Sequence, residues 1–87
     1  MSNEILVLKS KLAENQRQLR ELTITADNLI ISVRESLNVY EEDFTALPLN
    51  GTMQDMKELH SIWQKASKLK ALITKMKKDL GIEDDES

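Results

Sequence analysis

An apolar residue recurs at every seventh position along the first half of the chain, and this spacing constrains the fold more than any other feature. Seven residues share this phase, which we label a: Ile5, Leu12, Leu19, Ala26, Val33, Tyr40 and Leu47. A second phase, d, runs from Leu8 to Leu29 and then moves one residue later, to Ile30. Two apolar positions per heptad form one stripe on an α-helix, so the pattern predicts a single long helix over residues 4–46. The β-branched run at 22–25 leaves open a break at that point.

A second apolar stripe follows in the last third of the chain. Its members are separated by three or four residues throughout: Leu59, Ile62, Ala66, Leu69, Ile73, Met76 and Leu80. Thr52 with Asp55 three residues later is typical of a helix N-terminus, and Gly81 suits the residue that ends a helix. We therefore predict a second helix over residues 53–80, followed by a disordered acidic tail at 83–87.

The turn between the two helices is expected at residues 47–52. The only proline, Pro48, lies there next to the pair Asn50-Gly51, and both features favour a change of chain direction. Because short connections join antiparallel neighbours, the predicted fold is all-α, an antiparallel αα-hairpin in one domain of residues 1–82. A turn at this place would bring together facing residues whose numbers add up to about 99.

This hairpin would leave apolar residues of the first helix uncovered. In this register residues 4–18 extend past the end of the second helix, and the first helix is apolar on several sides around Ile24 and Ile31. A helix that is hydrophobic all round is normally buried all round. We therefore predict self-association, as a dimer or larger helical bundle, or binding to another protein; a monomer with a mobile N-terminus is the alternative. The residues expected to bind the partner are Ile5, Leu8, Leu12, Ile24, Ile31 and Trp63.

The sequence offers little for chemistry. Its 87 residues include no cysteine, which excludes disulfides and thiolate metal sites. His60 is the only histidine, and an acid–base or metal site needs partners that the sequence does not supply around it. We predict no enzyme activity and no catalytic, cofactor-binding or metal site. Trp63 fits two interpretations equally, a binding hot spot or a core residue near the turn.

The second helix is locally basic although the net charge of the chain is −3. Nucleic-acid sites usually add arginine or stacked aromatic residues to such charge, so binding of nucleic acid or of an anionic surface is the alternative function. Its residues would be Lys65, Lys68, Lys70, Lys75 and Lys77. The leading hypothesis is a non-enzymatic protein–protein interaction module: a small subunit, adaptor or inhibitor of a larger assembly. The longest apolar run is too short for a signal peptide or membrane span, so we expect an intracellular protein, cytoplasmic or nuclear.

Overall fold

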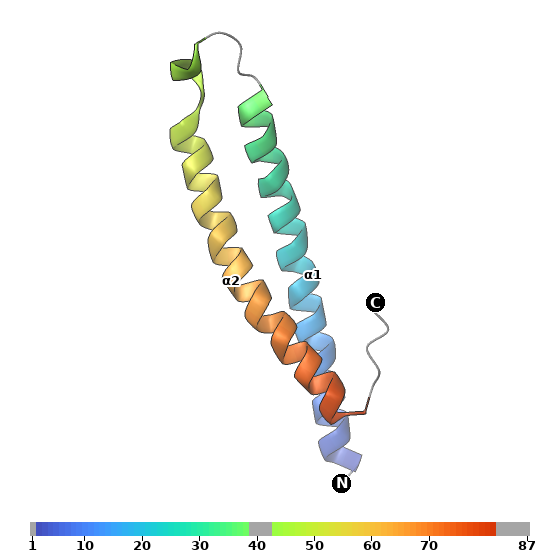
Figure 1. Ribbon diagram of the computed structural model, residues 1–87. Coiled ribbons are helices and arrows are strands. Elements are labelled where there is room, and N and C mark those ends of the chain that lie inside the picture. Colours follow the sequence, from blue (N-terminus) through green and yellow to red (C-terminus); the bar gives the residue numbers. More distant parts are fainter. Residues whose placement is uncertain (1, 39–42, 82–87) are drawn as a thin grey trace.

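Two long helices packed side by side make up most of the described part of the protein. The computed structural model describes residues 2–38 and 43–81, which form helix α1 (Ser2–Asn38), the short 3-10 helix η1 (Phe44–Ala46) and helix α2 (Leu49–Asp79). The two long helices run antiparallel along a molecule that measures 65 × 23 × 14 Å (Figure 1). The prediction of an all-α antiparallel hairpin with a longer first helix is confirmed.

The helix interface keeps a strict seven-residue spacing on both helices. On α2 the predicted stripe is confirmed, because every member from Leu59 to Leu80 is buried or half-buried. On α1 the expected shift of the d phase is wrong: Leu29 is 9% exposed, whereas Ile30 is 39% exposed. The next d position is Ser36, which is half-buried, and Leu37 beside it is exposed. The helix interface therefore keeps the strict heptad, even at Ser36, where the neighbouring Leu37 is more apolar.

Helix α1 passes through residues 22–25 without a break. The Thr23 hydroxyl donates to the Leu19 carbonyl at 2.8 Å, and the Thr25 hydroxyl donates to the Glu21 carbonyl at 3.1 Å. Both hydroxyls thus bond back to the preceding turn, which satisfies them inside the helix rather than at a cap.

The chain reverses earlier than predicted. Among the described residues α1 ends at Asn38 rather than at residue 46, and α2 begins at Leu49 rather than at residue 53. Both the backbone N–H and the hydroxyl of Thr52 donate to the Pro48 carbonyl at 2.9 Å, so this threonine lies in the first turn of α2 and caps nothing. The predicted turn at 47–52 is wrong because a proline is well tolerated just before a helix, where its missing N–H is not needed. The predicted tail at 83–87 lies outside the described residues.

The earlier reversal changes the register of the two helices. The Asn15 amide nitrogen lies 3.2 Å from the Met76 sulfur, and the Ser32 hydroxyl donates to an Asp55 carboxylate oxygen at 2.9 Å. The numbers of these paired residues add up to 91 and 87 rather than to the predicted value near 99. Relative to the prediction, α2 is therefore moved along α1 by about ten residues, or roughly 15 Å.

This shift covers a residue that was predicted to be free. Leu12 is 6% exposed and forms a buried cluster with Ile73 and Met76. Three half-buried leucines pack against the cluster: Leu19, Leu69 and Leu80. The prediction that Leu12 is available to a partner is wrong, because the end of α2 lies beside this part of α1 (Figure 1). The uncovered N-terminal segment is reduced to the first turns, where residues 5–8 are exposed.

The half of the helix interface near the turn is more polar than the half near the chain ends. Its buried or half-buried residues include Ser32, Ser36, Thr52 and Asp55. The apolar cluster around Leu12 lies at the other end, beside the last turns of α2. Both halves contain buried apolar residues, since Leu29 and Ile62 lie in the turn half, but the layers nearest the turn are the more polar.

Asp43 starts η1 as its N-terminal cap. One of its carboxylate oxygens accepts the Thr45 hydroxyl at 2.6 Å and the Thr45 backbone N–H at 3.0 Å. These two hydrogen bonds, the hydroxyl first, hold the pKa of Asp43 below its usual value. Capping by a carboxylate satisfies a backbone donor that the short helix leaves free.

We expect this cap to weaken in acid. Because the folded-state pKa of Asp43 is lowered, its contribution to the folded state is present above the ordinary pKa of 3.8 and is lost as the pH falls through the folded-state value. NMR titration of the Asp43 carboxyl should show this pKa rising toward 3.8 in Thr45→Val. The remote Thr74→Val should leave it unchanged. An unaltered Asp43 pKa in Thr45→Val would show that the hydrogen bonds do not set it.

Candidate protein interaction face

The helix interface divides the long surface of the hairpin into two sides. On one side, called the Trp63 side, a groove is lined by Thr23 of α1 together with Trp63 and Lys70 of α2. On the other side, called the Lys68 side, a groove is lined by Glu21 of α1 with Lys68 of α2. Residues seven positions apart lie in one row along a helix. A residue seven or fourteen positions from one of these groove residues therefore lies on the same side of the hairpin.

Exposed apolar side chains gather on the turn half of the Trp63 side and on the adjoining outer face of α1. On α1 the exposed residues are Ile24, Ile30, Ile31 and Leu37, which we call the α1 patch. On α2 they are Leu49, Met53, Met56 and Trp63. Ile30 and Leu37 continue the row of Thr23, and Met56 continues that of Trp63, so both rows border the same groove side. Together the two sets form the association face.

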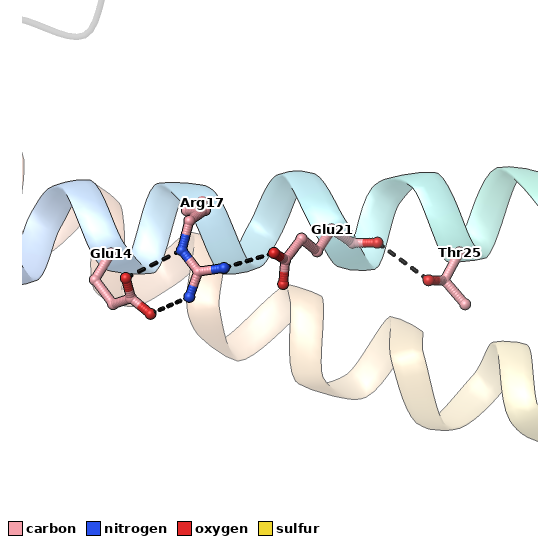
Figure 2. A network of polar contacts seen from close by, with 4 residues as sticks. All are labelled: Glu14, Arg17, Glu21 and Thr25. Atoms are coloured by element: carbon pink, nitrogen blue, oxygen red, sulfur yellow. Dashed lines mark hydrogen bonds and ion pairs between the residues drawn. The ribbon is translucent and has the colours of Figure 1, made fainter.

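The outer face of α1 changes character along its length. In the N-terminal half Arg17 donates to Glu14, from its Nε to Oε2 at 3.1 Å, and to Glu21 at 2.5 Å (Figure 2). The hydrogen bond from Arg17 lowers the pKa of Glu14, and the same contact raises the pKa of the guanidinium. Seven and fourteen residues after Arg17, the same row holds Ile24 and Ile31. Along this row, charged and solvated residues thus give way to apolar ones.

Trp63 lies at the surface. Its side chain is 61% exposed, which contradicts the interpretation as a core residue near the turn. Its ring stacks on His60, one helical turn earlier, with the ring centroids 5.7 Å apart and the planes 17° from parallel. His60 therefore supports the exposed indole. Within residues 2–38 and 43–81, no group of His, Asp and Glu side chains is suited to bind a metal ion.

The N-terminal candidates do not join this face. Ile5 and Leu8 are exposed, together with Leu6 and Val7 between them. From Leu8 to Ile24 the helix rises roughly 24 Å, so the N-terminal residues form a separate exposed segment. The structure thus places Ile24 and Ile31 on the outer face of α1 and Trp63 beside the groove on α2, and it leaves Ile5 and Leu8 apart from all three.

The lysines of α2 are divided between the two sides of the hairpin. Lys65 and Lys68 line the groove on the Lys68 side, where Glu21 also lies. Lys70 and Lys77 line the groove on the Trp63 side together with Arg20, and Lys75 continues the row of Lys68. The predicted basic face is therefore not a single surface.

Ile30, Leu37 and the two methionines of the association face are not among the partner-binding residues predicted from sequence. The sequence prediction places Ile30 and Leu37 in the helix interface. Counting strictly by seven from Leu22 gives Leu29 and Ser36 as the interface residues instead, and it leaves Ile30 and Leu37 outside the interface. Met53 and Met56 carry no comparable signal, because the register of the turn decides whether they are covered.

The described residues contain no helix that is long and apolar enough to cross a membrane. Comparison with models of protein families, with curated proteins and with solved structures finds no match for this chain.

Proposed function

We propose that this protein is a non-enzymatic interaction module, a small helical subunit, adaptor or inhibitor that acts by binding protein through the association face. The observation that supports this most directly is the concentration of eight exposed apolar side chains on the turn half of the Trp63 side and the adjoining outer face of α1. Soluble monomers rarely expose contiguous apolar patches of this kind, and such patches mark interaction sites.

The energetics favour association through these residues. Complete burial of an Ile, Leu or Met side chain contributes about 1.5–3 kcal/mol, so a side chain that is half-exposed in the free protein adds on the order of 1 kcal/mol when covered. The exposed Trp63 has the residue type most enriched at binding hot spots, and its stacking on His60 limits the rotamers that binding must fix. A charge placed among these residues removes the apolar contribution and adds a desolvation cost.

The proposal is tested by comparing Ile31→Asp with Leu72→Asp. Leu72 is 45% exposed on the Lys68 side, close to the exposure of Ile31, so it is a matched control for a new surface charge. We expect the intact wild-type chain to associate, with itself or with a protein captured from its own cells. Ile31→Asp should weaken that association at least tenfold, whereas Leu72→Asp should not.

Light scattering measures self-association, quantitative affinity capture measures binding to other proteins, and circular dichroism verifies that both variants fold. The proposal is wrong if no association of the wild type depends on Ile31.

Binding of an anionic surface or nucleic acid is the second candidate. Arg20, Lys70 and Lys77 line one groove with Trp63, which combines positive charge with an exposed aromatic ring. Because the other lysines face the opposite side, this proposal is less favoured. A steep loss of binding with added salt would distinguish it from apolar association.

A further inference from the structure

The α1 patch and its two charged residues, Asp27 and Arg34, form a symmetric pattern along the helix. In this pattern apolar residues pair with apolar residues, and each charge pairs with the opposite charge. Reflected about the midpoint between residues 30 and 31, each member meets a complementary one: Ile24 with Leu37, Asp27 with Arg34, and Ile30 with Ile31. A two-fold interface has this property, because residue i contacts residue j of the partner while j contacts i.

All six residues lie on one continuous strip of α1. Spacings of three, four and three residues connect one row, which is Ile24, Asp27, Ile31 and Arg34. The same spacings connect a second row, which is Asp27, Ile30, Arg34 and Leu37. These are the spacings that the helix interface itself uses, so the strip has the geometry for packing against another long helix.

The two charges of the strip lack a partner within the described residues. Asp27 and Arg34 are both exposed, and neither forms an ion pair there. They are seven residues apart on one helix, roughly 10.5 Å, which is too far for direct contact with each other. Against an antiparallel copy, each would lie beside the opposite charge of the other chain.

We infer that the α1 patch of the association face, with Asp27 and Arg34, binds a second copy of this chain, and that the two α1 helices pack antiparallel about a two-fold axis between residues 30 and 31. This inference rests on the proposed function and names its partner. Ile30 and Ile31 lie at the centre, and an Asp27–Arg34 pair flanks them on each side. The contact extends over residues 24–37, roughly 20 Å of helix.

The strip is small for an interface. Six residues from each copy are fewer than the roughly 20–30 residues per side of a standard protein–protein contact. We therefore expect a dimer that dissociates at micromolar concentrations, and whose formation depends on the charge pattern as well as on the isoleucines.

Charge reversal tests the axis directly. In Asp27→Arg the homodimer would place two arginines together at both flanks, and in Arg34→Asp it would place two aspartates together. Each variant alone should raise the dimer dissociation constant about tenfold or more. An equimolar mixture of the two restores both opposite-charge pairs, and its dissociation constant should return to within a few-fold of the wild-type value. Lys68→Asp, an equal change of charge on the Lys68 side, is the control. Analytical ultracentrifugation measures all of these constants.

Cross-linking provides a second measurement of the same axis. The chain has no cysteine, so single introduced thiols report on their own position. Ile31→Cys should form a covalent dimer on oxidation, because the two copies of residue 31 lie beside the axis. Ile24→Cys alone should not, because its two copies would be roughly 20 Å apart. A mixture of Ile24→Cys with Leu37→Cys should cross-link.

Three results would overturn the inference. A wild-type chain that stays monomeric at about 1 mM would do so, yet the proposed function would survive if capture of another protein still depended on Ile31. If the dissociation constant of the dimer is unchanged by both Asp27→Arg and Arg34→Asp, the dimer uses another interface. The same conclusion follows if Leu72→Asp dissociates the dimer.

Discussion

Replacement of Ile73 by alanine is expected to destabilise the hairpin by about 2–4 kcal/mol. Ile73 is 6% exposed and belongs to the buried cluster with Leu12 and Met76. Removing its branched side chain leaves a cavity that two rigid helices cannot close fully. Because a chain of this size has a total stability near the lower end of the usual 5–15 kcal/mol, most of the margin would be lost.

Urea denaturation followed by circular dichroism measures this loss. Leu72→Ala is the control, since Leu72 is the neighbouring residue and points to solvent on the Lys68 side. We expect its effect to stay within about 1 kcal/mol. Equal destabilisation by the two variants would mean that Ile73 is not in the interface as described. Measurements at several protein concentrations separate this effect from association.

A disulfide between residues 32 and 55 is expected to stabilise the hairpin by about 3 kcal/mol. The Ser32 hydroxyl and the Asp55 carboxylate are 2.9 Å apart and the residues are separated by 23 positions, so the bond would close a loop of that length. The loss of unfolded-chain entropy for such a loop gives this magnitude, less any strain from the disulfide geometry.

The matching control separates the observed register from the one predicted from sequence. Ser32→Cys with Asp55→Cys should oxidise readily within one molecule. Ser32→Cys with Ser67→Cys would cross-link only if the paired numbers added up to 99. In the structure residue 67 lies about 12 residues, or roughly 18 Å, past residue 55 along α2. Thermal unfolding with and without reductant, with monomers selected by gel filtration, measures the outcome. Efficient oxidation of the second pair would contradict the register.

The sequence predicts the hairpin and its second helix well because their signals are repeated many times. The stripe from Leu59 to Leu80 keeps the same two seven-residue series throughout, so no single ambiguous residue can displace it. The phase near Leu29 is different, since Leu29 and Ile30 are both apolar and local spacing accepts either. Only the facing helix decides which of the two is covered, and that information is not local.

The turn is harder to predict for a related reason. Pro48 and Gly51 are turn residues in most contexts, yet both also fit the start of a helix when the chain has already reversed. The register is set by burial summed along both helices, including that of Leu12, and not by the turn residues themselves. The exposed positions of Ile24 and Ile31 agree with expectation because they depend only on the period of α1. The exposed positions of Ile30 and Leu37 depend on which seven-residue series faces α2, and the sequence pattern does not decide between the two series.

The polar character of the turn half of the helix interface has a consequence for local opening. Contacts close in sequence ordinarily form first, because they cost the least loop-closure entropy. In this hairpin the layers nearest the turn contain Ser32, Ser36, Thr52 and Asp55, whereas the buried apolar cluster joins residues as distant in sequence as Leu12 and Met76. Amide protection against hydrogen exchange should accordingly be greatest around Leu12, Ile73 and Met76 and should fall toward the turn. The α1 patch lies on the half that opens more easily, so a second molecule bound there would also suppress that opening.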